Sequence, residues 1–219
     1  MARPAPTTLE CTGPNTAFTP AAANASDNCS VATVNNPAAG MFPLGMTTLA
    51  YSATDGSGAS ASCTSAVTIV DTTAPVISSV TNSFSTISPP NHNMVPLNLT
   101  VTATDSCAGD AINTAAACRV TNITGNEAIN STGDGNTDPD WVFGTGLTAS
   151  VRAERKGNGT GRIYTVTVVC ADAQGNDSAP QTTTVAVPHS QGRKEPQRFT
   201  GSETGYNTGS FFGFSDVVE

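Results

Sequence analysis

Apolar and polar residues alternate along several stretches of the chain, and no convincing helical period of 3.6 residues is present. The clearest alternating stretches are residues 49–53, 97–103, 147–153 and 164–170. A period of two is typical of β-strands with one buried face. Turn clusters rich in Gly, Asp and Asn, such as residues 55–58 and 174–177, separate the stretches. The pattern therefore predicts an all-β protein.

Two segments repeat the same order of features. Residues 51–71 contain a strand, an Asp-x-x-Gly turn and a returning strand, and residues 164–187 contain the same series. Two copies of a terminal hairpin imply two copies of a domain. We therefore expect two tandem immunoglobulin-like β-sandwiches, at residues 1–74 and 75–190, with a C-terminal extension at 191–219.

Charge is scarce in this chain and restricts its partners. Only 12% of the 219 residues are charged, against about 25% in a typical soluble domain. The net charge is −8, and Arg3 is the only basic residue before Ala117. Nucleic acid and anionic membrane surfaces are therefore unexpected partners, whereas bound cations are compatible with the acidity. No apolar run approaches the length of about 20 residues that spans a bilayer. The first residues are no signal peptide, so export would need one that preceded them.

The cysteines predict an oxidising compartment. Their number is even, no Cys-x-x-Cys pair occurs, and only two His are present, which makes a zinc site improbable. We expect the cysteines to form disulfides, as in a secreted protein. The alternative is that they are buried free thiols. The sequence leaves many pairings open among the candidates, which are Cys11, Cys29, Cys63, Cys107, Cys118 and Cys170.

A series of short motifs in the first third of the chain is similar to a known family. In order they are residues 27–29 (Asp-Asn-Cys), 42–45 (Phe-Pro-Leu-Gly), 47–58, 62–63 (Ser-Cys) and 67–71. They resemble the hyalin repeat (HYR) domain over residues 7–74, although Gly58-Ala59 stands where the family usually has Gly-Asn. The resemblance implies an immunoglobulin-like sandwich with a role in cell adhesion and no catalytic residues.

The rest of the chain resembles a second immunoglobulin-like module of bacterial secreted proteins. The motifs that carry this resemblance are residues 89–96, 104–107, 133–135, 140–141, 152–155 and 172–176. The resemblance implies an extracellular or cell-surface location in a bacterium.

One loop carries oxygen ligands at alternate positions, namely Asp134, Asn136, Asp138 and Asp140. Oxygen atoms are the ligands of Ca²⁺, so the loop is a candidate calcium site. It is no EF-hand, because Pro139 and Thr145 replace the required Gly and Glu. The alternative is a series of Asx turns, which we also expect at Asp55 and Asp172. A calcium ion near Asp71, between the two modules, is a further hypothesis.

Catalytic chemistry is not expected. His92 and His189 are isolated, and no Gly-x-Ser-x-Gly motif occurs. The Gly-rich segment 157–161 is predicted to be a hairpin loop between residues 147–154 and 163–170 rather than a phosphate-binding loop. Four carboxylates could in principle form a glycosidase pair, and these are Glu127, Asp138, Asp140 and Glu154.

The tail after residue 191 differs from the rest and contains Phe211, Phe212 and Phe214. It is either flexible or a segment that becomes ordered on a partner, for example by adding a strand to a sheet edge. We therefore expect a non-catalytic extracellular structural or adhesive module, a candidate subunit of a surface filament or layer assembled by strand donation. Its partner would be another copy or a neighbouring surface protein. The alternative is a carbohydrate-binding or spacer module of a larger secreted hydrolase, with a polysaccharide partner and Trp141 as the main aromatic contact.

Overall fold

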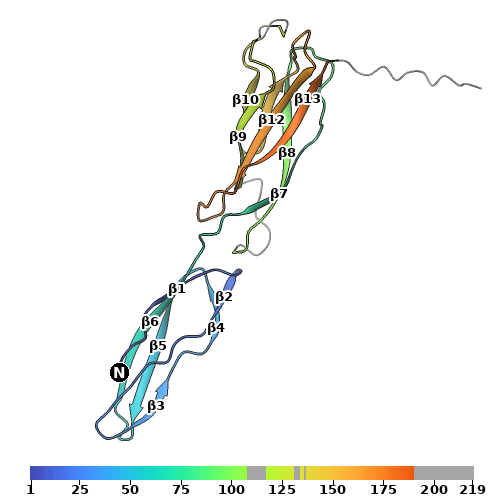
Figure 1. Cartoon of the computed structure of the whole chain (residues 1–219). Helices are drawn as coiled ribbons and strands as arrows, with labels where there is room; N and C mark the ends of the chain where they lie inside the picture. Colours follow the sequence, from blue (N-terminus) through green and yellow to red (C-terminus); the bar gives the residue numbers. More distant parts are fainter. Residues whose placement is uncertain (108–116, 131–133, 136, 190–219) are drawn as a thin grey trace, which may run out of the picture. The chain divides into compact units, whose positions relative to one another are not determined.

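The computed structural model describes residues 1–107, 117–130, 134–135 and 137–189. These residues form an all-β structure, and no helix among them has the length and apolar character needed to cross a membrane. Figure 1 shows the strands along the chain. The predicted fold class, two immunoglobulin-like β-sandwiches in tandem, is confirmed.

The first sandwich contains six strands: β1 (Thr7–Glu10), β2 (Asn15–Phe18), β3 (Val31–Asn35), β4 (Gly40–Pro43), β5 (Gly45–Asp55) and β6 (Ser60–Val70). One sheet has the order β1-β6-β5-β3, and the other contains β2 and β4. β1 pairs with β6 in parallel, and β5 and β6 form the antiparallel hairpin that the sequence predicted. The turn of that hairpin follows from Asp55, whose carboxylate accepts hydrogen bonds from the backbone N–H groups of Ser57 and Ala59.

The described residues of the second sandwich form seven strands: β7 (Val76–Asn82), β8 (Met94–Thr104), β9 (Cys118–Gly125), β10 (Trp141–Phe143), β11 (Thr148–Arg152), β12 (Gly161–Cys170) and β13 (Gln181–Pro188). Its sheets have the orders β10-β11-β8-β7 and β13-β12-β9. β12 and β13 pair in antiparallel fashion, as the repeated pattern predicted. The predicted hairpin across residues 157–161 is wrong, because β11 and β12 belong to different sheets and their connection crosses between them.

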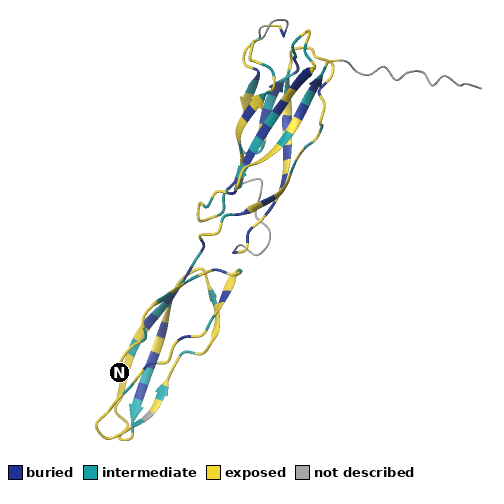
Figure 2. Ribbon diagram, viewed as in Figure 1, coloured by how far each residue is buried: buried dark blue, intermediate teal, exposed yellow. Residues whose placement is uncertain are grey.

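Each sandwich has its own hydrophobic core, built by the alternation seen in the sequence. Buried residues alternate with exposed or half-buried ones along β5, β6, β8 and β12 in Figure 2. The first core includes Leu49, Tyr51, Val67 and Ile69, with Phe18 and Phe42 packed against it from β2 and β4. The second core is larger and includes Leu97, Ile123, Val151, Tyr164, Val166 and Val185.

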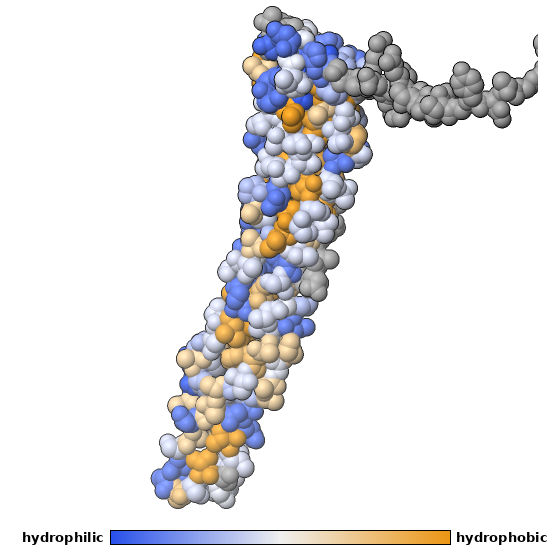
Figure 3. Space-filling model, turned by 45° about the vertical axis from the view of Figure 1, so that its right-hand side comes forward, coloured by the Kyte–Doolittle hydropathy of each residue, from blue (hydrophilic) through white to orange (hydrophobic). Residues whose placement is uncertain are grey.

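The compact unit formed by these cores is Met1–His189. The domain boundaries predicted at residues 74 and 190 are not tested by this division and stay predictions. The tail residues Phe211, Phe212 and Phe214 lie outside the described residues. On the face shown in Figure 3, apolar residues reach the surface in several places between polar ones.

Candidate functional site

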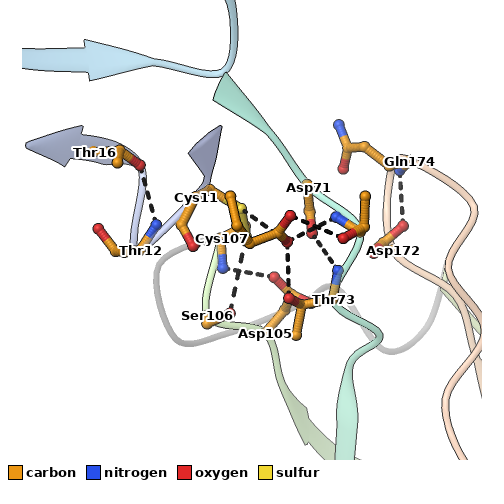
Figure 4. Close-up of a disulfide and its surroundings, with 12 residues drawn as sticks. Cys11, Thr12, Thr16, Asp71, Thr73, Asp105, Ser106, Cys107, Asp172 and Gln174 are labelled. Carbon is orange, nitrogen blue, oxygen red and sulfur yellow. Dashed lines mark hydrogen bonds between the residues drawn. A yellow bond between two sulfur atoms is a disulfide. The ribbon is translucent and has the colours of Figure 1, made fainter. Parts of the chain in front are cut away.

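A disulfide joins the two sandwiches. Cys11 follows β1 in the first sandwich and Cys107 follows β8 in the second, and their Cα atoms are 5.5 Å apart despite a sequence separation of 96 residues. Both cysteines are buried. Figure 4 shows this disulfide with the acidic residues around it. A second disulfide links Cys118 on β9 to Cys170 on β12, so four of the six candidates are confirmed.

The expectation of a disulfide is wrong for the other two cysteines, because Cys29 is an exposed thiol and Cys63 a half-buried one. Cys29 precedes Val31, which pairs with Asp55 at one end of β5. Cys63 pairs with Tyr51, four residues further along the same strand. A strand rises about 3.3 Å per residue, so the two thiols lie on the order of 13 Å apart or more, too far for a disulfide.

The segment between the two sandwiches is held by hydrogen bonds from both of them. The Glu10 carboxylate accepts bonds of 2.8 Å from the Thr72 N–H and from the hydroxyls of Thr72 and Thr73. These bonds, led by the one from the Thr72 backbone, lower the pKa of Glu10. From the second sandwich, the Asn176 side-chain amide donates to the Asp71 carbonyl at 3.2 Å. The linker is therefore fixed to β1 on one side and to the Asp172 turn on the other.

Three carboxylates meet beside this linker. Oxygen atoms of Asp71, Asp105 and Asp172 lie within 4.8 Å of one another. Burial raises the pKa of Asp71, and the negative charges of Asp105, Asp172 and Glu10 add to the effect. Carboxylate oxygens in this arrangement could hold a hard divalent cation such as Ca²⁺. Sequence reasoning named only Asp71 here, since nothing in the local pattern shows that residues 71, 105 and 172 meet.

Asp172 also shapes its own turn, as expected. Its carboxylate accepts bonds from the backbone N–H groups of Gln174 and Asn176 at 2.8 and 2.9 Å. Its pKa is lowered, because these bonds and the Asn176 side chain outweigh the opposing effect of burial. One carboxylate therefore both closes the turn and faces the acidic cluster.

At one end of the second sandwich, a buried arginine binds four carboxylates. The Arg162 guanidinium pairs with Asp140, with Glu154 at 3.2 Å, and with Asp134 and Glu127 at 3.4 Å each. The side chains of Arg162, Asp134 and Glu154 are completely buried. The Arg162 guanidinium also donates to the Ala128 carbonyl at 3.1 Å. The guanidinium thus satisfies its donors inside the protein, as a buried charge requires.

The electrostatics of this cluster follow from burial and close charges. Burial and a hydrogen bond with Glu154 raise the pKa of Asp140, against the opposing charge of Arg162. Burial also raises the pKa of Tyr164 to about 12. Burial opposes the ionisation of Arg162, but contacts with Tyr164 and Asp140 more than compensate and raise its pKa. Arg162 is therefore a permanent cation among acidic groups.

Two of the four candidate calcium ligands lie in this cluster around Arg162. Asp134 and Asp140 face Arg162, whereas Asp138 is exposed and Asn136 lies outside the described residues. The structure therefore gives two of these carboxylates an arginine as their cationic partner, and calcium binding by this loop stays a prediction. Sequence reasoning missed Arg162, although the alternation of β12 puts it on the same face as the buried Tyr164 and Val166.

The remaining candidates have structural contacts. Three of the four carboxylates considered for glycoside hydrolysis bind Arg162, and the fourth, Asp138, is exposed. The half-exposed His92 ring lies 3.4 Å from Glu154, and His189 lies 3.0 Å from the Gly157 carbonyl. Trp141 is half-buried and packs edge-on against Tyr164, with ring centroids 6.4 Å apart. Trp141 therefore presents only part of its ring as a platform for a sugar.

These sheets and cores define the class of the protein, an all-β protein of immunoglobulin-like sandwiches. Within it, residues 6–69 match the HYR domain family, which confirms the resemblance for the first sandwich. The second module matches no family here, so its predicted kinship stays a prediction. No curated protein matches the chain.

Two solved structures are similar over part of their length. Extracellular cadherin domains 1–4 of protocadherin gamma B7 show 14% identity and a TM-score of 0.29, covering 65% of this chain and 31% of that one. The human desmocollin-1 ectodomain shows 15% identity and a TM-score of 0.21, covering 70% of this chain and 25% of that one. The chain thus spans a third or less of either, and at these TM-scores neither supports an argument about its function.

Proposed function

We propose that this chain is an extracellular, non-catalytic module with a structural or adhesive role. The observation that carries the proposal is the disulfide between Cys11 and Cys107, which adds a second covalent connection between the sandwiches. Disulfides persist in oxidising, extracellular compartments. The HYR match over residues 6–69 supports the same role, because adhesion is the function proposed for that family.

The covalent connection suits a protein that transmits force or holds a fixed geometry. Without it, only the linker at residues 71–75 would join the sandwiches, and short linkers are where domain motions occur. The hydrogen bonds of Glu10 and Asn176 to this linker act in the same direction. Three of the four carboxylates considered for catalysis bind Arg162 instead, which favours a structural role over an enzymatic one.

A comparison of the oxidised wild type with a Cys107→Ser variant tests whether the Cys11–Cys107 disulfide joins the two sandwiches. A broad-specificity protease that cuts within residues 71–75 should leave the wild-type halves joined on a non-reducing gel and separate on a reducing one. The variant should separate in both. Rapid separation of the wild type without reductant would contradict the proposal.

We further propose that copies of the chain assemble by strand donation from the tail that contains Phe211, Phe212 and Phe214. Tail strands that enter another copy's sheet form a head-to-tail contact, which gives fibres when it does not close into a ring. Negative-stain microscopy and light scattering of the purified chain should show polymers, and removal of residues 192–219 should abolish them. Polymers that survive the removal would exclude the tail as donor.

Calcium has two proposed sites, the loop at residues 134–140 and the three carboxylates at the linker. The linker cluster has the more favourable composition. None of the described Lys or Arg side chains forms an ion pair with Asp71 or Asp172, whereas Asp134 and Asp140 already bind Arg162. Isothermal titration with Ca²⁺ after treatment with a chelator tests both, and a heat of binding lost in Asp71→Asn would assign it to the linker.

A further inference from the structure

Strand β10 is the outermost strand of its sheet. Among the described residues it pairs only with β11, from Trp141 opposite Val151 to Phe143 opposite Ala149. The other side of β10 therefore has no strand neighbour in this part of the chain. Backbone N–H and C=O groups along such an edge can pair with an added strand.

The other outer strands of the second sandwich carry features that discourage such pairing. β7 has an irregular register between Ile77 and Ser79, and β9 carries the charged Arg119. β13 is partly covered by a bridge between Thr86 and Ala186. Bulges, charges and covering segments are the usual protections of a sheet edge. Among these features, only its short length protects β10, because its register is regular and its three residues are uncharged.

The side chains of β10 are unusually apolar for an edge. Val142 and Phe143 are each 48% exposed. Successive strand residues point to opposite faces of the sheet, so one added strand could cover part of both. Two charged residues near β10 are already bound, since Asp140 is buried against Arg162, and Arg152 donates to the Pro139 and His92 carbonyls. Three residues give few main-chain hydrogen bonds, so apolar contacts have to supply much of the affinity.

We propose that the β10 edge accepts residues 210–215 as an added strand. The inference rests on the tail being a donor, as proposed above, and names its acceptor. The segment Ser-Phe-Phe-Gly-Phe-Ser has no charge and no proline, and alternation puts Phe212 and Phe214 on one face. It follows the end of β13 by about 20 residues, a linker that spans about 25 Å as a flexible coil and about 70 Å fully extended. The added strand can therefore come from a neighbouring copy or from the same chain.

Trp141, the only tryptophan of the chain, lies on the proposed acceptor strand and reports its occupation. The receiver is the full-length chain in which Phe211, Phe212 and Phe214 are changed to Ser, so that its own tail cannot compete. The probe is a synthetic peptide of residues 208–219. We expect the peptide to shift the Trp141 emission to shorter wavelength in a saturable manner. A peptide with Phe212→Ser and Phe214→Ser should not.

Two matched substitutions in the receiver test the location. Val142→Lys places a charge on the edge and should abolish the shift. Ile163→Lys makes the same kind of change at a residue that is 44% exposed but lies on β12, the middle strand of the other sheet. It should leave the shift intact. No shift in the parent receiver, or equal loss in both variants, would overturn the β10 assignment.

Sedimentation of the intact chain separates this inference from the assembly proposal. If the peptide binds at β10 but the intact chain stays monomeric, β10 is supported as the acceptor of the chain's own tail, and assembly is refuted. Polymers that persist in the intact chain with Val142→Lys uphold assembly and refute β10 as the acceptor. Polymers that disappear with Val142→Lys but persist with Ile163→Lys support both.

Discussion

Replacement of Arg162 by Met tests how far the second sandwich depends on its buried cation. Met keeps much of the aliphatic length of Arg and removes the guanidinium. The substitution leaves four carboxylates at one end of the core without their shared partner. Three of them have side chains that are at most 1% exposed, so water cannot readily replace the lost contacts.

The expected cost follows from this burial. Removal of one partner of a buried ion pair destabilises a protein by about 3–5 kcal/mol, because the other charge is left uncompensated. Four partners of one guanidinium place this case at the upper end of that range. For a domain of about 100 residues, each kcal/mol corresponds to a change of roughly 4–8 °C in Tm. We therefore expect the Tm of the second sandwich to fall by about 20–40 °C.

Thermal unfolding followed by Trp141 fluorescence measures this change, because Trp141 belongs to the second sandwich. The matched control is Arg119→Met, which removes an arginine from an exposed pair with Asp177 in which the side chains are 46% and 54% exposed. An exposed pair contributes less than about 1 kcal/mol. Asp140→Asn with Glu154→Gln, added to Arg162→Met, should recover part of the lost stability by removing two of the uncompensated charges.

A loss of Tm in Arg162→Met no larger than the loss in Arg119→Met would refute a strong dependence on the buried cation. A triple variant less stable than Arg162→Met alone would refute it as well, since the cost would then come from packing rather than from charge. Acid provides an independent check. Protonation of the carboxylates at low pH removes the uncompensated charges, so the difference between wild type and Arg162→Met should shrink as the pH falls.

Four further predictions concern the first sandwich and the linker. Loss of the disulfide in Cys107→Ser opens a loop of about 100 residues, for which chain entropy gives about 4–5 kcal/mol, and the urea midpoint should fall accordingly. Because the pKa of Asp71 is raised, the folded state keeps a proton that the unfolded state releases, and the free energy of unfolding should fall as the pH rises above about 4. In urea titrations at several pH values, the free energy of unfolding of Asp71→Asn should depend less steeply on pH. In calorimetry at neutral pH, millimolar Ca²⁺ should raise the Tm of the wild type, because a ligand that binds the folded state stabilises it, and a chelator should reverse the increase. An unchanged Tm would refute the calcium sites. A thiol reagent should label the exposed Cys29 in the native chain at once and the half-buried Cys63 much more slowly.

The sequence predicts the strands well because the signal for them is local. Alternation identified the buried faces of β5, β8 and β12, and the Asp-x-x-Gly turns identified the hairpins that close each sandwich. The segment at residues 157–161 was assigned wrongly for the same reason. A hairpin and a crossover between sheets have similar local sequences, and they differ only in which distant strands β11 and β12 pair with.

The candidate site was harder to predict because it is made of distant residues. Whether two cysteines can bond depends on strand register, and register placed Cys29 and Cys63 at different levels of the sheet. Arg162 could have been found, since a charged residue on the apolar face of a strand needs buried partners. The sequence offered several acidic residues to fill that role, and alternation alone could not select among them.

The two acidic clusters show how differently one chain can keep carboxylates close together. At the end of the second sandwich, the charge of Arg162 compensates its neighbours, so the cluster is stabilised by its own attraction. At the linker, Asp71 and Asp172 form no ion pair with any described Lys or Arg, and the negative charges of Asp105, Asp172 and Glu10 add to burial in raising the pKa of Asp71. Bonds other than ion pairs to Asp71 and Asp172 must help to hold the linker cluster together. The Cys11–Cys107 disulfide can do so, because Cys107 lies two residues from Asp105 and donates its backbone N–H to the Asp105 carboxylate. Reduction of this disulfide should therefore let the carboxylates separate, which predicts that reductant lowers the pKa of Asp71 toward its ordinary value, measurable by NMR titration of its carboxyl carbon.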